Sequence, residues 1–201
     1  MKIKPNIVIV DLEEYLKLFS ISLSEGAKRT LIDIEEFAYQ CDNPTNYKLF
    51  FSKLIRNCKE IQSVISGKGS NSNLVSLILE KDYYDGIDEL STYEKENELY
   101  SQIYKRLNCE KTAVIDKALE YCVNENRTSL ENIDIFLAAM DEYEKNLEQD
   151  GGEWVEKELN KTYTTLSHVY GRYNLKLWIK FDDIREALIR IRKGDKNIKV
   201  A

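Results

Sequence analysis

The chain has 201 residues, of which 29 are Lys or Arg, 35 are Asp or Glu and 43% are hydrophobic, and its formal net charge is −6. This composition is typical of a folded globular protein and disfavours generic nucleic-acid binding, which depends on neutralising phosphates with basic side chains. No stretch approaches the roughly 18 uninterrupted apolar residues of a membrane-spanning helix, and the apolar run before Asp11 is too short for a signal peptide. We therefore expect a soluble, cytoplasmic protein without a membrane partner.

Apolar residues recur at helical rather than alternating spacing through most of the chain, and the two prolines are Pro5 and Pro44. The sequence therefore predicts an all-α fold in a single domain over residues 1–201. In chain order, the predicted helices cover residues 11–19, 24–40, 46–65, 73–81, 92–107, 110–125, 129–147, 152–170 and 182–193. Ser24 is a plausible N-cap of the second of these helices.

Two segments near the ends of the chain have strand-like composition. The first is the apolar run Ile7–Val10, and the second, residues 174–181, alternates polar and apolar residues as far as Trp178. The two could pair as a small two-stranded sheet that joins the termini. A C-terminal strand and helix are accordingly predicted over residues 174–193.

The most polar and glycine-rich segment, Ser66–Asn73, is predicted to be a loop. Its Gly67-Lys68-Gly69-Ser70 element lacks the earlier glycine of a phosphate-binding loop, and Gly69 stands where Ser or Thr should follow the lysine. We therefore expect no nucleotide at this loop and no ATP hydrolysis.

An internal repeat is predicted from a constant offset of 84 residues, which needs no gap. It aligns Leu31 with Ile115 and Ile34 with Ala118, and it keeps the two loop caps, Thr45 and Ser129, in register. The predicted repeats cover about residues 20–82 and 107–170, with a connector over residues 83–106. The alternative is coincidence, because any two amphipathic hairpins can be shifted until their apolar positions agree.

The repeated pattern, Leu-x7-Leu-x2-Ile-x3-Ala followed by a cap and an apolar second helix, resembles the double-repeat N-terminal domain of Clp-type AAA+ unfoldases over about residues 20–170. The second unit, residues 114–140, is the more similar one. The chain departs from the family pattern because neither unit has a histidine before its apolar run, and the first unit has residues 47–54 there instead. The resemblance implies a pseudo-two-fold helical repeat bundle that binds a substrate or adaptor protein. The partner could then be an unfoldase or its substrate.

Residues typical of metal or nucleophile chemistry are sparse. The four cysteines form no C-x-x-C pair and the chain has a single histidine, His168, so we expect no metal and no cofactor. The cysteines, which we expect to be reduced, are Cys41, Cys58, Cys109 and Cys122. A helical enzyme that uses His168 as a base remains an alternative, but no nucleophile near it in sequence supports this.

Charge is distributed unevenly along the chain. Residues 131–158 contain ten acidic and two basic side chains, a balance of −8, whereas six basic and two acidic side chains from Arg185 onward give +4. The acidic stretch is a solvated helix face or a surface for a basic partner, as in a phage or host-defence regulator that inhibits a nucleic-acid-binding enzyme. The basic end either complements the acidic stretch in self-association or reflects the preference of basic residues for helix C-termini.

The chain is also rich in tyrosine, with 13 residues. Tyrosine suits protein interfaces because it combines a large apolar ring with a polar hydroxyl. The predicted partner-binding residues, which we expect to be exposed around the connector, are Tyr83, Tyr84, Tyr93, Tyr100 and Tyr104. The sequence thus predicts a non-catalytic protein–protein interaction module.

Overall fold

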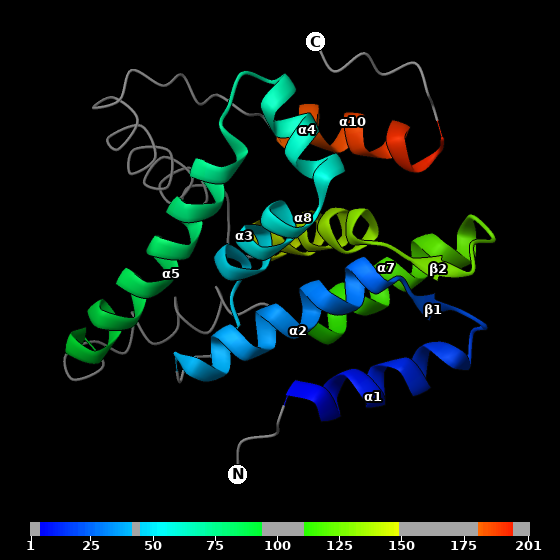
Figure 1. The fold of residues 1–201 in the computed structure, drawn as a ribbon, viewed down its shortest axis with the longest axis horizontal. Helices are drawn as coiled ribbons and strands as arrows, with labels where there is room; N and C mark the ends of the chain where they lie inside the picture. The colour runs from blue at the N-terminus through cyan, green and yellow to red at the C-terminus, as the bar shows by residue number, and fades with distance from the viewer. Residues whose placement is uncertain (1–4, 42–44, 94–110, 149–180, 195–201) are drawn as a thin grey trace.

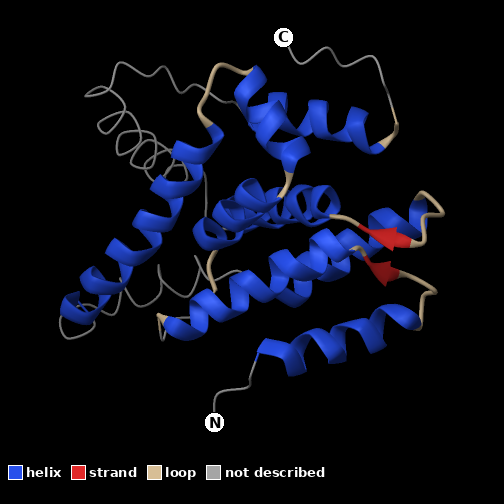
Figure 2. Ribbon diagram, in the orientation of Figure 1, coloured by secondary structure: helices blue, strands red, loops and turns tan. Residues whose placement is uncertain are grey.

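The computed structural model describes residues 5–41, 45–93, 111–148 and 181–194. Helices make up 80% of these residues, and a two-stranded parallel sheet accompanies them (Figures 1 and 2). The all-α prediction with a small sheet is therefore confirmed. The position of the sheet, however, differs from the predicted one.

Helix α1 covers Pro5–Lys17 and includes the run Ile7–Val10, so the predicted strand there is wrong. Proline is well accommodated in the first turn of a helix, where its missing N–H is not needed. Ile9 and Leu16 are buried seven residues apart, and the partly buried Leu12 lies between them on the same face. Within the apolar run, Ile9 thus belongs to a buried helical stripe, whereas Val10 is exposed. Of the proposed pairing partner, residues 174–181, the first seven lie outside the described residues and Phe181 begins a helix.

The observed sheet joins two segments that are far apart in the chain. Strand β1 (Ser22–Leu23) pairs in parallel with β2 (Ser129–Leu130), so that Ser22 lies opposite Ser129 and Leu23 opposite Leu130. The Ser24 N–H also donates to the carbonyl oxygen of Leu130 at 3.1 Å. This short pairing holds the segment around residue 22 beside the segment around residue 129.

Each strand connects two helices. β1 lies between α1 and α2 (Glu25–Gln40), and β2 lies between α7 (Lys111–Asn124) and α8 (Asn132–Glu148). In the sheet, residue 22 lies opposite residue 129, so the strands place α1 in correspondence with α7 and α2 in correspondence with α8, at an offset of 107 residues. The predicted repeat has an offset of 84 residues and instead matches α2 with α7, and the helix after α2 with α8. The 84-residue repeat stays a prediction.

The predicted helix over residues 46–65 is divided into α3 (Tyr47–Asn57) and α4 (Lys59–Gly67). The break occurs at Cys58, whose φ of −123° and ψ of 113° are those of an extended residue. The side-chain amide of Gln62 donates to the carbonyl oxygen of Arg56 at 2.7 Å and so satisfies a group near the break. Neither proline nor glycine marks this position, and the sequence periodicity therefore missed it.

The next helix, α5 (Ser72–Tyr93), begins after a turn and is longer than the predicted span of 73–81. It packs along α3, where Ser52 and Ser76 exchange hydrogen bonds: each hydroxyl donates to the other residue's carbonyl oxygen, at 2.8 and 3.0 Å. These small side chains allow the two helices to approach closely. The last described helix, α10 (Phe181–Arg192), confirms the helix predicted over residues 182–193.

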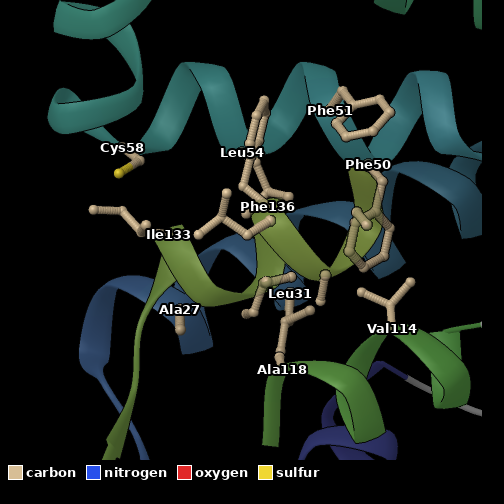
Figure 3. Packing of buried hydrophobic residues seen from close by; sticks show 14 of the residues in the cluster. Ala27, Leu31, Phe50, Phe51, Leu54, Cys58, Val114, Ala118, Ile133 and Phe136 are labelled. Atoms are coloured by element: carbon tan, nitrogen blue, oxygen red, sulfur yellow. The ribbon is translucent and has the colours of Figure 1, made fainter. Parts of the chain in front are cut away.

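The core lies where α2, α3, α7 and α8 meet (Figure 3). α8 contacts α2, α3 and α7, and its Phe136 contacts Phe51 of α3 edge-on with ring centroids 5.2 Å apart. The buried residues labelled there include Leu31 of α2, Leu54 of α3 and Val114 of α7. The central position of α8 explains why both its apolar residues and its charged residues contact several other elements.

Candidate protein-binding surface

One face of α5 exposes large apolar side chains. Leu77 is 59% exposed and Tyr84 is 46% exposed, and because they are seven residues apart on a helix they lie on the same face. Lys81 lies between them and is also exposed. We call Leu77, Lys81 and Tyr84 the α5 surface.

Tyr84 is held in position by the end of α2. Its ring contacts the Phe37 ring edge-on with centroids 5.3 Å apart. The neighbouring Cys41 thiol above all, together with partial burial, raises the pKa of the Tyr84 hydroxyl above its usual value. The side chain is therefore half-exposed but already oriented.

The other predicted tyrosines have different positions. Tyr83 is only 1% exposed and contacts Phe37 from the core side, so the expectation that it is exposed is wrong. Neighbouring residues of a helix point about 100° apart, and one of this pair therefore faces inward. Tyr100, Tyr104 and the side chain of Tyr93 lie outside the described residues. A partner-binding role for these tyrosines stays a prediction.

A buried lysine also contacts Phe37. The Lys53 residue is 2% exposed, and its ammonium lies 3.8 Å from the centroid of the Phe37 ring. The same ammonium lies 3.5 Å from a carboxylate oxygen of Glu80 and 3.7 Å from one of Asp33. Cation–π and charge interactions at Lys53 thus link α2, α3 and α5 beneath Tyr84.

A second concentration of polar groups lies at the start of α8. Asp134 has no exposed surface, and Arg127 donates two hydrogen bonds to its two oxygens, at 2.8 and 2.6 Å. The backbone N–H of Glu131 donates to the same carboxylate at 2.9 Å, in the manner of a capping box. Asp134 therefore fixes the loop before α8 and the first turn of the helix together.

Two arginines of α10 face acidic residues of α8 and of the turn that follows α7. Arg185 donates to Asp141 at 3.1 Å and to Glu144 at 2.6 Å, and Arg192 donates to Glu125 at 2.7 Å. The Arg192 guanidinium also lies over the ring of Tyr121, 4.8 Å from its centroid. Asp134, Asp141 and Glu144 are thus paired within the chain, which argues against a fully available acidic surface on α8. The acidic residues of 149–158 lie outside the described residues.

Two further predictions concern metal ions and membranes. In the part of the chain that the structure describes, no group of three or more His, Cys, Asp or Glu side chains is arranged to hold a metal ion. None of the described helices combines the length and apolar character needed to cross a membrane. His168 and Cys109 lie outside the described residues.

The described cysteines are free thiols in different environments, and their reactivities should differ. Burial above all raises the pKa of both Cys58 and Cys122 to about 12, so both thiols stay protonated at pH 8, whereas Cys41 is only half-buried. Because the thiolate is the reactive form, we expect Cys41 to be alkylated well before Cys58 and Cys122 in the folded protein. Peptide mapping by mass spectrometry checks this order, and equal rates in urea are the control. Equal rates in the folded protein would contradict it.

Sequence reasoning missed several exposed apolar residues. Leu77 could have been found from its seven-residue spacing to Tyr84. Leu18, which is 78% exposed, and its exposed neighbour Phe19 lie in the turn between α1 and β1. We call Leu18 and Phe19 the α1 turn surface. Figure 1 shows that this turn and α5 lie on opposite sides of the view.

Comparisons of the chain with protein-family models, curated proteins and solved structures find no match.

Proposed function

We propose that this chain is a protein-interaction module without catalytic activity, which binds a protein partner through the α5 surface. The observation that carries the proposal is Tyr84, a half-exposed aromatic side chain whose ring already packs edge-on against Phe37. An oriented aromatic residue loses little conformational freedom on binding, and tyrosine is frequent among residues that dominate interface energies. Leu77 adds apolar area on the same face, and Lys81 adds a charge.

The resemblance to Clp-type N-terminal domains suggests a class of partner. Those domains capture substrates or adaptors for an unfoldase, and the partner proposed for this chain is accordingly an unfoldase or one of its substrates. The free thiols of Cys41, Cys58 and Cys122 support the proposal that the chain acts in a reducing compartment such as the cytoplasm.

A comparative pull-down tests the proposal. The wild-type chain and the double variant Leu77→Ala/Tyr84→Ala are used to capture proteins from the same lysate, and the captured proteins are quantified by mass spectrometry. We expect the variant to lose the partner that the wild-type chain enriches, with binding weaker by roughly tenfold or more, because exposed aromatic anchors dominate such interfaces. The affinity is then measured with the purified partner.

The matched control is Leu18→Ala/Phe19→Ala, which removes two exposed apolar side chains from the α1 turn surface. It should retain the partner. Loss of the partner with the control alone would place the interface on the α1 turn surface and would refute the proposed site. If neither variant differs from the wild-type chain, neither surface binds the partner.

A further inference from the structure

Arg56 of α3 lies beside the α5 surface and is held only loosely. Its side chain is 58% exposed, and its guanidinium lies 3.7 Å from a carboxylate oxygen of Glu80, which is longer than a hydrogen bond. In the described part of the chain, Glu80 is the only charged side chain that pairs with it. A large part of this cation therefore remains accessible to water.

Glu80 places the cation next to the apolar side chains of the α5 surface. It follows Leu77 by three residues and precedes Tyr84 by four, so the three residues lie on the same side of the helix. Leu77 and Tyr84 are about 10 Å apart along the helix axis. Arg56 reaches the middle of this interval from the neighbouring helix α3, which Figure 1 shows close to α5.

The charge of Glu80 stays compensated when Arg56 turns away from it. The ammonium of the buried Lys53 lies 3.5 Å from the same carboxylate oxygen, and the Glu80 side chain is only 16% exposed. Because Lys53 neutralises Glu80 from inside the protein, Arg56 can pair with another carboxylate without leaving a buried charge unpaired. Arg56 is thus available to a partner.

The helices on this side of α5 are basic. Residues 45–71, which contain α3, α4 and the turn before α5, carry five basic side chains and one acidic side chain, a balance of +4 in a chain whose net charge is −6. Of these basic residues, Arg56, Lys59 and Lys68 are exposed. The local charge therefore favours an acidic partner over a neutral or basic one.

We propose that the partner of the α5 surface is an acidic amphipathic helix, whose apolar side chains contact Leu77 and Tyr84 and whose carboxylate pairs with Arg56. The inference rests on the proposed function and names the chemistry of the partner. The apolar stripe of a helix matches the spacing of Leu77 and Tyr84, and arginine binds carboxylates through two parallel hydrogen bonds. A nucleic acid would engage Arg56 but would leave the two apolar side chains without comparable contacts.

Three fluorescein-labelled synthetic peptides test the proposal on the full-length protein. They share one helical pattern of leucines and alanines and differ only at the polar positions, which are all glutamate, all glutamine or all lysine. Fluorescence anisotropy measures the three affinities. We expect the glutamate peptide to bind about fivefold more tightly than the glutamine peptide and the lysine peptide to bind most weakly, with smaller differences at high salt.

The variant Arg56→Gln removes the cation and leaves Leu77 and Tyr84 in place. It should bind the glutamate and glutamine peptides with affinities within about twofold of each other, and bind the glutamine peptide as the wild-type protein does. Arg29→Gln, the same change at an exposed position of α2, is the matched control and should keep the preference for glutamate. Circular dichroism checks that both variants are folded.

The double variant Leu77→Ala/Tyr84→Ala separates this inference from the proposed function. If it weakens binding of all three peptides while Arg56→Gln keeps the preference for glutamate, the α5 surface stands and the role of Arg56 is overturned. If it binds every peptide as the wild-type protein does, the α5 surface itself is refuted.

The wild-type protein alone decides the chemistry of the partner. Equal affinities for the glutamate and glutamine peptides, or no binding of the glutamate peptide at about 1 mM, would overturn the acidic helix. Arg56-dependent binding of a labelled single-stranded oligonucleotide, without binding of the glutamate peptide, would assign the cation to phosphate groups instead.

Discussion

Replacement of Asp134 by alanine is expected to lower the free energy of unfolding by about 3–5 kcal/mol. This carboxylate is fully buried and accepts hydrogen bonds from both terminal nitrogens of Arg127 and from the Glu131 backbone. Its removal leaves the Arg127 guanidinium without its main partner and the first turn of α8 without its cap. Urea unfolding followed by circular dichroism measures the loss.

A conservative variant of Asp134 and a control variant on α7 test whether the loss of stability comes from the buried carboxylate. Asp134→Asn keeps the size of the side chain and one carbonyl acceptor, so its loss of stability should be smaller than that of Asp134→Ala. Glu120→Ala, on the exposed face of α7, should change the free energy of unfolding by less than about 0.5 kcal/mol. If Asp134→Ala were as mild as Glu120→Ala, Asp134 would not be the residue that holds the start of α8.

Sequence periodicity located most of the described helices because their apolar faces follow the helical repeat. It failed at Ile7–Val10, where four consecutive apolar residues hid the stripe that continues to Leu16. It also missed the break at Cys58, which no proline or glycine marks. The pairing of β1 with β2 joins residues 107 positions apart, and no local pattern of either segment predicts such a contact.

The site residues show the same distinction between local and tertiary information. The tyrosine composition indicated an interface, but separating the exposed Tyr84 from the buried Tyr83 required the orientation of α5 against α2 and α3. Likewise, the sequence contained an acidic stretch and a basic end, and one predicted relation between them was self-association. Their pairing within the chain, through Arg185 and Arg192, depends on the docking of α10.

The second large stability effect is expected for Lys53→Ala, with a loss of about 2–4 kcal/mol in the free energy of unfolding. Truncation removes a buried aliphatic stem and takes the ammonium away from Phe37, Glu80 and Asp33. The expected loss is smaller than for Asp134→Ala, because Arg56 remains 3.7 Å from Glu80 and the Asp33 side chain is partly accessible to water. Urea unfolding again gives the measurement.

Lys53→Met separates packing from charge, because methionine fills much of the same volume without the ammonium. We expect it to retain more stability than Lys53→Ala and still to weaken partner binding, since Phe37 loses the cation that holds it beneath Tyr84. The binding affinity of a folded Lys53→Met variant therefore reports on the orientation of Tyr84 rather than on global stability. Unchanged affinity would mean that Tyr84 does not depend on Lys53, whereas weakened affinity with an intact fold would connect this buried lysine to the α5 surface.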